Sequence, residues 1–106
     1  MVFPLMAVAE AVRGQVTITP LAGVYRLQVQ ATGLAPGSVH SVHLHFGSCP
    51  STGVHVSVLG TVVGDAAGSG SLILTVQRPY SADGRFVIVY VGPSAGPLAA
   101  CAQLAG

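Results

Sequence analysis

The stretch "RGQVTITPLAGVYRLQVQA", from Arg13 to Ala31, decides the fold class because polar and apolar residues alternate along most of it. Val16 and Ile18 fall on one side of an extended chain with polar residues on the other, and the alternation returns from Val24 to Ala31. A period of two residues is typical of a strand with one buried face. The segment "PLAG" between the two halves indicates a turn, so the stretch is predicted to form a β-hairpin.

Strand signals continue through the rest of the chain in short segments that Pro and Gly separate. After the break "GLAPG", strands are predicted at Ser38–Phe46 and Val54–Leu59, followed by a hairpin around Asp65–Gly70. "GRFVIVYVG" is apolar on both faces, which predicts a central strand covered from both sides. The final residues fit either a last strand or a turn of helix. The predicted fold class is all-β, a Greek-key β-sandwich or barrel of seven or eight antiparallel strands.

A chain of 106 residues has the length of one domain, which we place at residues 13–106. Residues 1–12 are expected to be an extra strand or the remnant of an export signal, since Ala7-Val8-Ala9 has the small residues of a cleavage site. Only 7% of residues are charged, and the few arginines are scattered, so nucleic acid is not an expected partner. No apolar run approaches the length of a membrane span, about 20 residues.

All four histidines lie in "VHSVHLHFGSCPSTGVH", from Val39 to His55. In a strand, His43 and His45 share a face about 7 Å apart, a spacing that lets two imidazoles bind one ion. His55 follows a loop that can fold back and add a third imidazole. Imidazoles alone suit copper, zinc or nickel. The alternative for such an H-x-H pair is two solvated side chains on a polar face.

His40 falls on the other face of this strand, together with Val42, Leu44 and Phe46. These neighbours are apolar and are expected to face the core. His40 is therefore predicted to be a buried, hydrogen-bonded residue and not a metal ligand.

The two cysteines, Cys49 and Cys101, lie far apart in the sequence. Composition leaves open whether they are two buried thiols or one disulfide. A disulfide would stabilise the fold by roughly 4 kcal/mol in the chain-entropy model, and it would indicate a compartment outside the reducing cytosol.

Five ordered motifs resemble those of the copper/zinc superoxide dismutases. "GLAPGSVHSVHLHFGSC" resembles that family's "GL-x-PG … H-x-x-H-x-H … G … C" motif, and "PSTGVH" resembles its step from the disulfide cysteine to the metal-bridging histidine. "LGTVVGDAAGSGSL" is similar to its "LGN" strand and "D-x-x-G" hairpin. "GRFVIVY" and "GPSAGPLAACA" resemble the strand ending in the last copper ligand and the segment with the second cysteine. The resemblance runs from about Gly14 to the end of the chain.

The resemblance implies an eight-stranded Greek-key sandwich and a role for each matching residue. His43 and His45 fall on paired copper ligands, and His55 falls on the histidine that bridges copper and zinc. His40 matches a structural histidine. It also implies that Cys49 pairs with Cys101, which favours a periplasmic, envelope or secreted location.

The departures from the family pattern concern the second metal and the capture of superoxide. The loop that supplies the zinc ligands is missing after His55, and Asp65 belongs to a predicted hairpin tip, so no separate zinc site is expected. The fourth copper histidine falls on Tyr90, whose neutral phenol is a poor ligand. It is expected to pack and hydrogen-bond nearby, or to complete the copper site in place of water. The arginine that guides superoxide falls on Leu98.

The resulting expectation is one mononuclear copper site at His43, His45 and His55. With Leu98 in place of the arginine, electrostatic capture of an anion is weak. Copper binding, buffering or delivery, with weak or no dismutation, is then the expected function. The alternatives are a copper-only superoxide dismutase that yields oxygen and hydrogen peroxide, and a structural domain, self-associating as a homodimer, whose site is vestigial or occupied by zinc.

Overall fold

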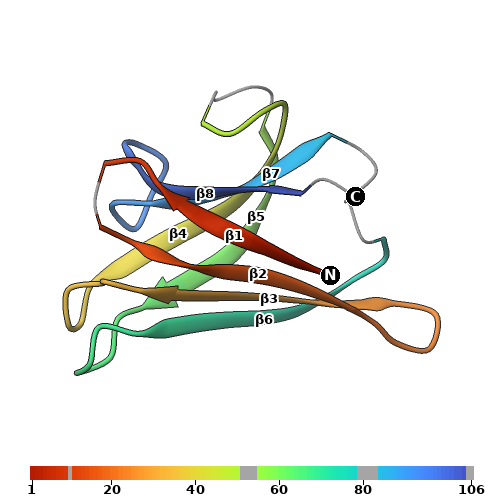
Figure 1. Cartoon of the computed structure of the whole chain (residues 1–106), viewed down its shortest axis with the longest axis horizontal. Helices are drawn as coiled ribbons and strands as arrows, with labels where there is room; N and C mark the ends of the chain where they lie inside the picture. The colour runs from red at the N-terminus through yellow and green to blue at the C-terminus, as the bar shows by residue number, and fades with distance from the viewer. Residues whose placement is uncertain (10, 51–54, 79–83, 105–106) are drawn as a thin grey trace.

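The computed structural model describes residues 1–9, 11–50, 55–78 and 84–104, with the backbone alone for His55 and Val56. The described part consists of eight strands and contains no helix (Figure 1). The strands are β1 (Val2–Ala7), β2 (Arg13–Pro20), β3 (Tyr25–Thr32), β4 (Val39–Phe46), β5 (His55–Val63), β6 (Gly70–Val76), β7 (Arg85–Tyr90) and β8 (Leu98–Leu104). The predicted all-β fold of seven or eight antiparallel strands is confirmed.

The strands form one sheet that folds on itself into a nearly closed barrel, in the order β5-β4-β7-β8-β1-β2-β3-β6. Every neighbouring pair is antiparallel. β6 returns beside β3, and β7 returns beside β4, so the chain crosses between the two halves of the barrel three times, from β3 to β4, from β5 to β6 and from β6 to β7. β1 joins the halves, because its first residues pair with β2 and Met6 and Ala7 pair with β8.

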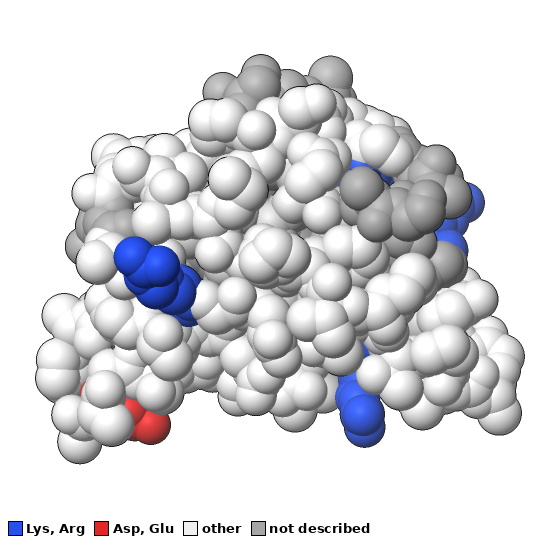
Figure 2. Space-filling model, in the orientation of Figure 1, with Lys and Arg blue, Asp and Glu red and all other residues white. Residues whose placement is uncertain are grey.

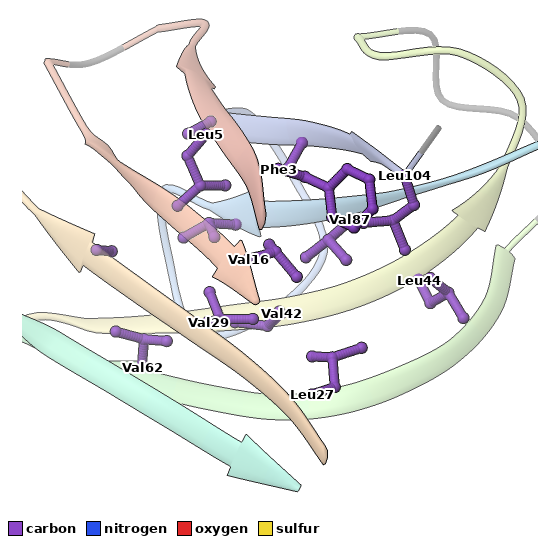
Figure 3. Packing of buried hydrophobic residues seen from close by; sticks show 14 of the residues in the cluster. Phe3, Leu5, Val16, Leu27, Val29, Val42, Leu44, Val62, Val87 and Leu104 are labelled. Atoms are coloured by element: carbon purple, nitrogen blue, oxygen red, sulfur yellow. The ribbon is translucent and has the colours of Figure 1, made fainter. Parts of the chain in front are cut away.

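The core fills the space between the two halves, as Figure 3 shows for the labelled valines and leucines. Val16 and Ile18 of β2 and Leu27 and Val29 of β3 are fully buried, as their alternation predicts. Burying each such side chain stabilises the fold by about 1.5–3 kcal/mol before chain entropy is counted. All residues of β7 after Arg85 are buried, which agrees with a strand covered on both sides.

Several boundaries differ from those expected. β5 continues past Leu59 to Val63, and the Asp65–Gly70 segment is a turn without a ladder behind it, because β5 and β6 are the two ends of the sheet. Asp65 Oδ1 stabilises this turn by accepting hydrogen bonds from the backbone N–H groups of Ala67 and Ser69. The residues at the chain ends form β1 and β8, and the described part has no helix long and apolar enough to cross a membrane.

Candidate metal centre

β4 positions the histidines, because it lies between β5 and β7 and alternates between two buried faces. Val42 and Leu44 point into the main core. His43 and His45 lie on the opposite face, as parity predicts, yet they are only 7% and 5% exposed. The alternative interpretation, a solvated pair on a polar face, is therefore wrong for the described structure.

A second, smaller apolar cluster explains this burial. It is built on β7 and β8, beside the outer face of β4, and we call it the outer cluster. Its members are Phe86, Ile88, Tyr90 and Cys101, with Cys49 and Leu98 packed against them. His45 is the register partner of Phe86, and His43 is the partner of Ile88, so both imidazoles lie beside this cluster.

Phe46 departs from its expected place in the core and is 41% exposed. It is the last residue of β4, and the guanidinium carbon of Arg85 lies 4.3 Å from the centre of its ring. The cation contact shields the ring in place of core packing.

The pairing of β4 with β5 is irregular at the histidines. The register shifts between Val42 and His43 and again between Leu44 and His45. Gly60, opposite Val42, has a φ of +153°, and a Cβ there would lie 2.9 Å from a methyl group of Leu72. Bulges of this kind change the direction of side chains along a strand. Both shifts in register lie next to His43 and His45, the two residues whose imidazoles form the candidate site.

The two imidazoles lie close enough for one ion. Their ring centres are 6.1 Å apart and their planes differ by 11°. Metal–nitrogen bonds of about 2.0 Å place an imidazole centre roughly 3 Å from the ion. One ion can therefore join rings up to about 6 Å apart, with the two nitrogens on nearly opposite sides of it. The separation of the His43 and His45 ring centres is therefore at the upper limit for two imidazoles that share one ion.

Tyr90 contacts both imidazoles from the neighbouring strand. Its hydroxyl lies 3.1 Å from Nε2 of His45, and its ring meets the ring of His43 edge-on at 4.7 Å between centres. The side chain is 3% exposed. Burial raises the pKa of Tyr90 above its ordinary value, so the phenol is neutral at physiological pH.

His40 holds the backbone of Tyr90 from the core side. Its Nδ1 lies 2.8 Å from the Tyr90 carbonyl oxygen, and since a carbonyl only accepts, Nδ1–H is the donor. Its Nε2 lies 2.7 Å from Oγ of Ser38. With both ring nitrogens engaged and 3% exposure, His40 is a buried connector between β4 and β7.

Ser41 is a residue that sequence reasoning missed. Its Oγ lies 2.8 Å from Nε2 of His43, and both side chains are buried. The available signal was a hydroxyl two positions before a candidate ligand on the same strand face. A hydrogen bond to one ring nitrogen fixes the orientation of an imidazole that binds a metal through the other.

Cys49 and Cys101 form a disulfide, with their Cα atoms 5.9 Å apart. Gln103 ties the same loop to β8, because its Oε1 accepts from the backbone N–H of Cys49 and its Nε2 donates to the carbonyl oxygens of Gly47 and Arg85. The segment that leaves the histidine strand is therefore attached to β8 at two points. Gln103 was not predicted from the sequence.

His55 begins β5, and its backbone is the register partner of His45. Its side chain lies outside the described residues, so its expected part in the site stays a prediction. Among the residues that are described, no group of three or more His, Cys, Asp or Glu could hold a metal ion.

Leu98, at the position where the resemblance places an arginine, is the register partner of Tyr90. Asp65 belongs to the β5–β6 turn.

A scan against protein-family models found no match to this chain, and a search of curated proteins also found none.

Proposed function

We propose that this chain is a copper-binding domain similar to the copper/zinc superoxide dismutases, with one copper ion held by His43, His45 and His55. The observation that supports this most strongly is the buried pair His43 and His45, whose ring centres are 6.1 Å apart. No side chain is assigned to a fourth position. The role that fits is copper binding, buffering or delivery, with weak or no dismutation of superoxide.

The donor chemistry supports copper. Two buried imidazoles at this separation, together with the imidazole expected from His55, form a set of nitrogen donors that suits copper. When bound, copper supplies one-electron redox chemistry. The protein's own part is to exclude water: His43 and His45 are buried, and the outer cluster lies beside them. Zinc also binds imidazole nitrogens and is the competing occupant, although divalent copper binds such donors more tightly.

Weak dismutation is proposed because little charge is available to attract an anion. Figure 2 shows isolated charged groups on a face that is otherwise uncharged. Leu98 takes the position beside Tyr90 where the resemblance places an arginine. Electrostatic steering raises association rates by about 10- to 1000-fold, so its loss lowers turnover in proportion.

The compartment we propose is oxidising: periplasm, cell envelope or the outside of the cell. The disulfide between Cys49 and Cys101 supports this, because such bonds persist mainly where glutathione and thioredoxin do not reduce them.

Two measurements on the copper-loaded protein test the proposal. Electron paramagnetic resonance of Cu(II) should show hyperfine coupling to imidazole nitrogens that disappears in the double variant His43→Ala, His45→Ala. The control is Ser71→Ala, Thr75→Ala, which changes two exposed residues of β6. A superoxide-consumption assay then separates carrier from enzyme. A rate near diffusion control would contradict the carrier role, and an unchanged Cu(II) spectrum in the double variant would contradict the site.

A further inference from the structure

The contact between Tyr90 and His45 is built into the fold from several sides. The Tyr90 backbone is hydrogen-bonded by His40, its ring packs edge-on against His43, and its side chain belongs to the outer cluster. These contacts leave the hydroxyl 3.1 Å from Nε2 of His45. The phenol therefore occupies the side of His45 that is turned toward the neighbourhood of His43, where an ion shared by both imidazoles would lie.

A neutral imidazole has one nitrogen that can accept, and its lone pair binds either a proton donor or a metal ion. A neutral phenol is a good proton donor and a poor ligand. If the Tyr90 hydroxyl donates to Nε2 of His45, metal binding through that nitrogen has to break the hydrogen bond first. The free energy of that hydrogen bond is then subtracted from the free energy of metal binding.

We propose that Tyr90 is an internal competitor for the metal: its hydroxyl occupies Nε2 of His45 in the metal-free protein and keeps copper weakly bound and exchangeable. This inference rests on the proposed copper site and specifies how its affinity is set. It assigns Tyr90 a role opposite to that of a ligand, although it lies where the resemblance places one. Weakened binding suits a protein that buffers copper or passes it on.

Ser41 makes a similar contact with a different consequence. Its hydroxyl engages Nε2 of His43, so His43 would meet a metal through Nδ1. That bond can persist when metal binds, and it orients the imidazole. The two hydroxyls are therefore predicted to act in opposite directions, Ser41 in favour of metal binding and Tyr90 against it.

The test compares Tyr90→Phe with the wild type, using a colorimetric Cu(I) chelator as competitor and the intact, disulfide-bonded protein. A net hydrogen bond of about 0.5–1.5 kcal/mol corresponds to a roughly 2- to 10-fold change in affinity. Tyr90→Phe should therefore bind Cu(I) about 2- to 10-fold more tightly. Tyr25→Phe, which removes a hydroxyl from β3, is the matched control and should leave the affinity unchanged. Equal or weaker binding by Tyr90→Phe overturns the inference.

Nitrogen-15 NMR of the metal-free protein gives a readout without copper. Nε2 of His45 should be unprotonated in the wild type, and its chemical shift should change in Tyr90→Phe but not in Tyr25→Phe. A proton on Nε2 in the wild type would reverse the direction of the hydrogen bond and overturn the inference. If the wild type binds Cu(I) no better than the double variant His43→Ala, His45→Ala, the copper site fails, and this inference fails with it. Copper binding that is intact in the wild type but weaker in Tyr90→Phe refutes the competitor role alone.

Discussion

His40 donates a hydrogen bond from Nδ1 to the carbonyl oxygen of Tyr90, at 2.8 Å, across the junction of β4 and β7. The residue thereby fixes the phenol from the core side while the phenol meets His43 and His45 on the outer side. His40, which is not a proposed ligand, therefore helps to position the Tyr90 side chain beside His43 and His45.

Replacing His40 should destabilise the fold. His40→Ala leaves the Tyr90 carbonyl without its donor in a buried position, which costs about 1–3 kcal/mol, and urea unfolding of the metal-free protein measures the loss. Ser38→Ala removes the partner of Nε2 at a more exposed position and should cost less. A loss in Ser38→Ala as large as that in His40→Ala would contradict the assigned role of the His40–Tyr90 bond.

Removing the disulfide should weaken both the fold and the metal site. The variant Cys49→Ala, Cys101→Ala should lose roughly 4 kcal/mol of unfolding free energy, measured in urea. Cu(I) affinity should fall as well, because the segment leading to His55 loses one of its two attachments to β8. If stability falls while Cu(I) affinity is unchanged, the loop does not position a ligand.

Ser41→Ala should weaken metal binding without a large effect on stability. Loss of a hydrogen bond to a ligating imidazole typically lowers metal affinity about 10- to 100-fold. Competition with a Cu(I) chelator measures this change, and Ser41→Thr, which keeps a hydroxyl, is expected to retain most of the affinity. Unchanged binding in Ser41→Ala would show that the contact with His43 does not orient a ligand.

The metal-free protein should lose stability in strongly alkaline solution. Burial raises the pKa of Tyr90 in the folded state, so the unfolded chain ionises first as pH rises. The stabilising contribution is present below the pKa of the unfolded tyrosine, about 10, and is lost as pH rises through the higher folded value. Unfolding free energies measured across this range should fall less steeply for Tyr90→Phe than for the wild type. Parallel curves would contradict the prediction.

Strand parity was enough to predict the faces of β4 from His40 to His45, since side chains alternate along any strand; it failed only at Phe46, the last residue. His43 and His45 lie opposite Val42 and Leu44 for that reason alone. Their burial could not be predicted, because the residues beside them come from β7 and β8, far along the sequence. The shifts in register between β4 and β5 could not be predicted either, because Gly60 indicates a bulge only when its partner strand is known.

The pairing of Cys49 with Cys101 also joins residues that are distant in the sequence. Composition left thiols and a disulfide open, and the resemblance to a family supplied the pairing that the structure contains. The hydrogen bond between Ser41 and His43 depends only on residues two positions apart, so it was within reach of the sequence. The contact of Tyr90 with His45 depends on β7 lying beside β4. The resemblance to a family placed Tyr90 near the histidines, whereas the residue pattern did not.

A Cu(I) competition titration of the wild type against His43→Ala, His45→Ala tests the central claim most directly. The wild type should bind one Cu(I) per chain, and the double variant should lose that binding while Ser71→Ala, Thr75→Ala retains it. Equal Cu(I) affinity in the wild type and the double variant would contradict the claim that these two buried imidazoles hold the metal.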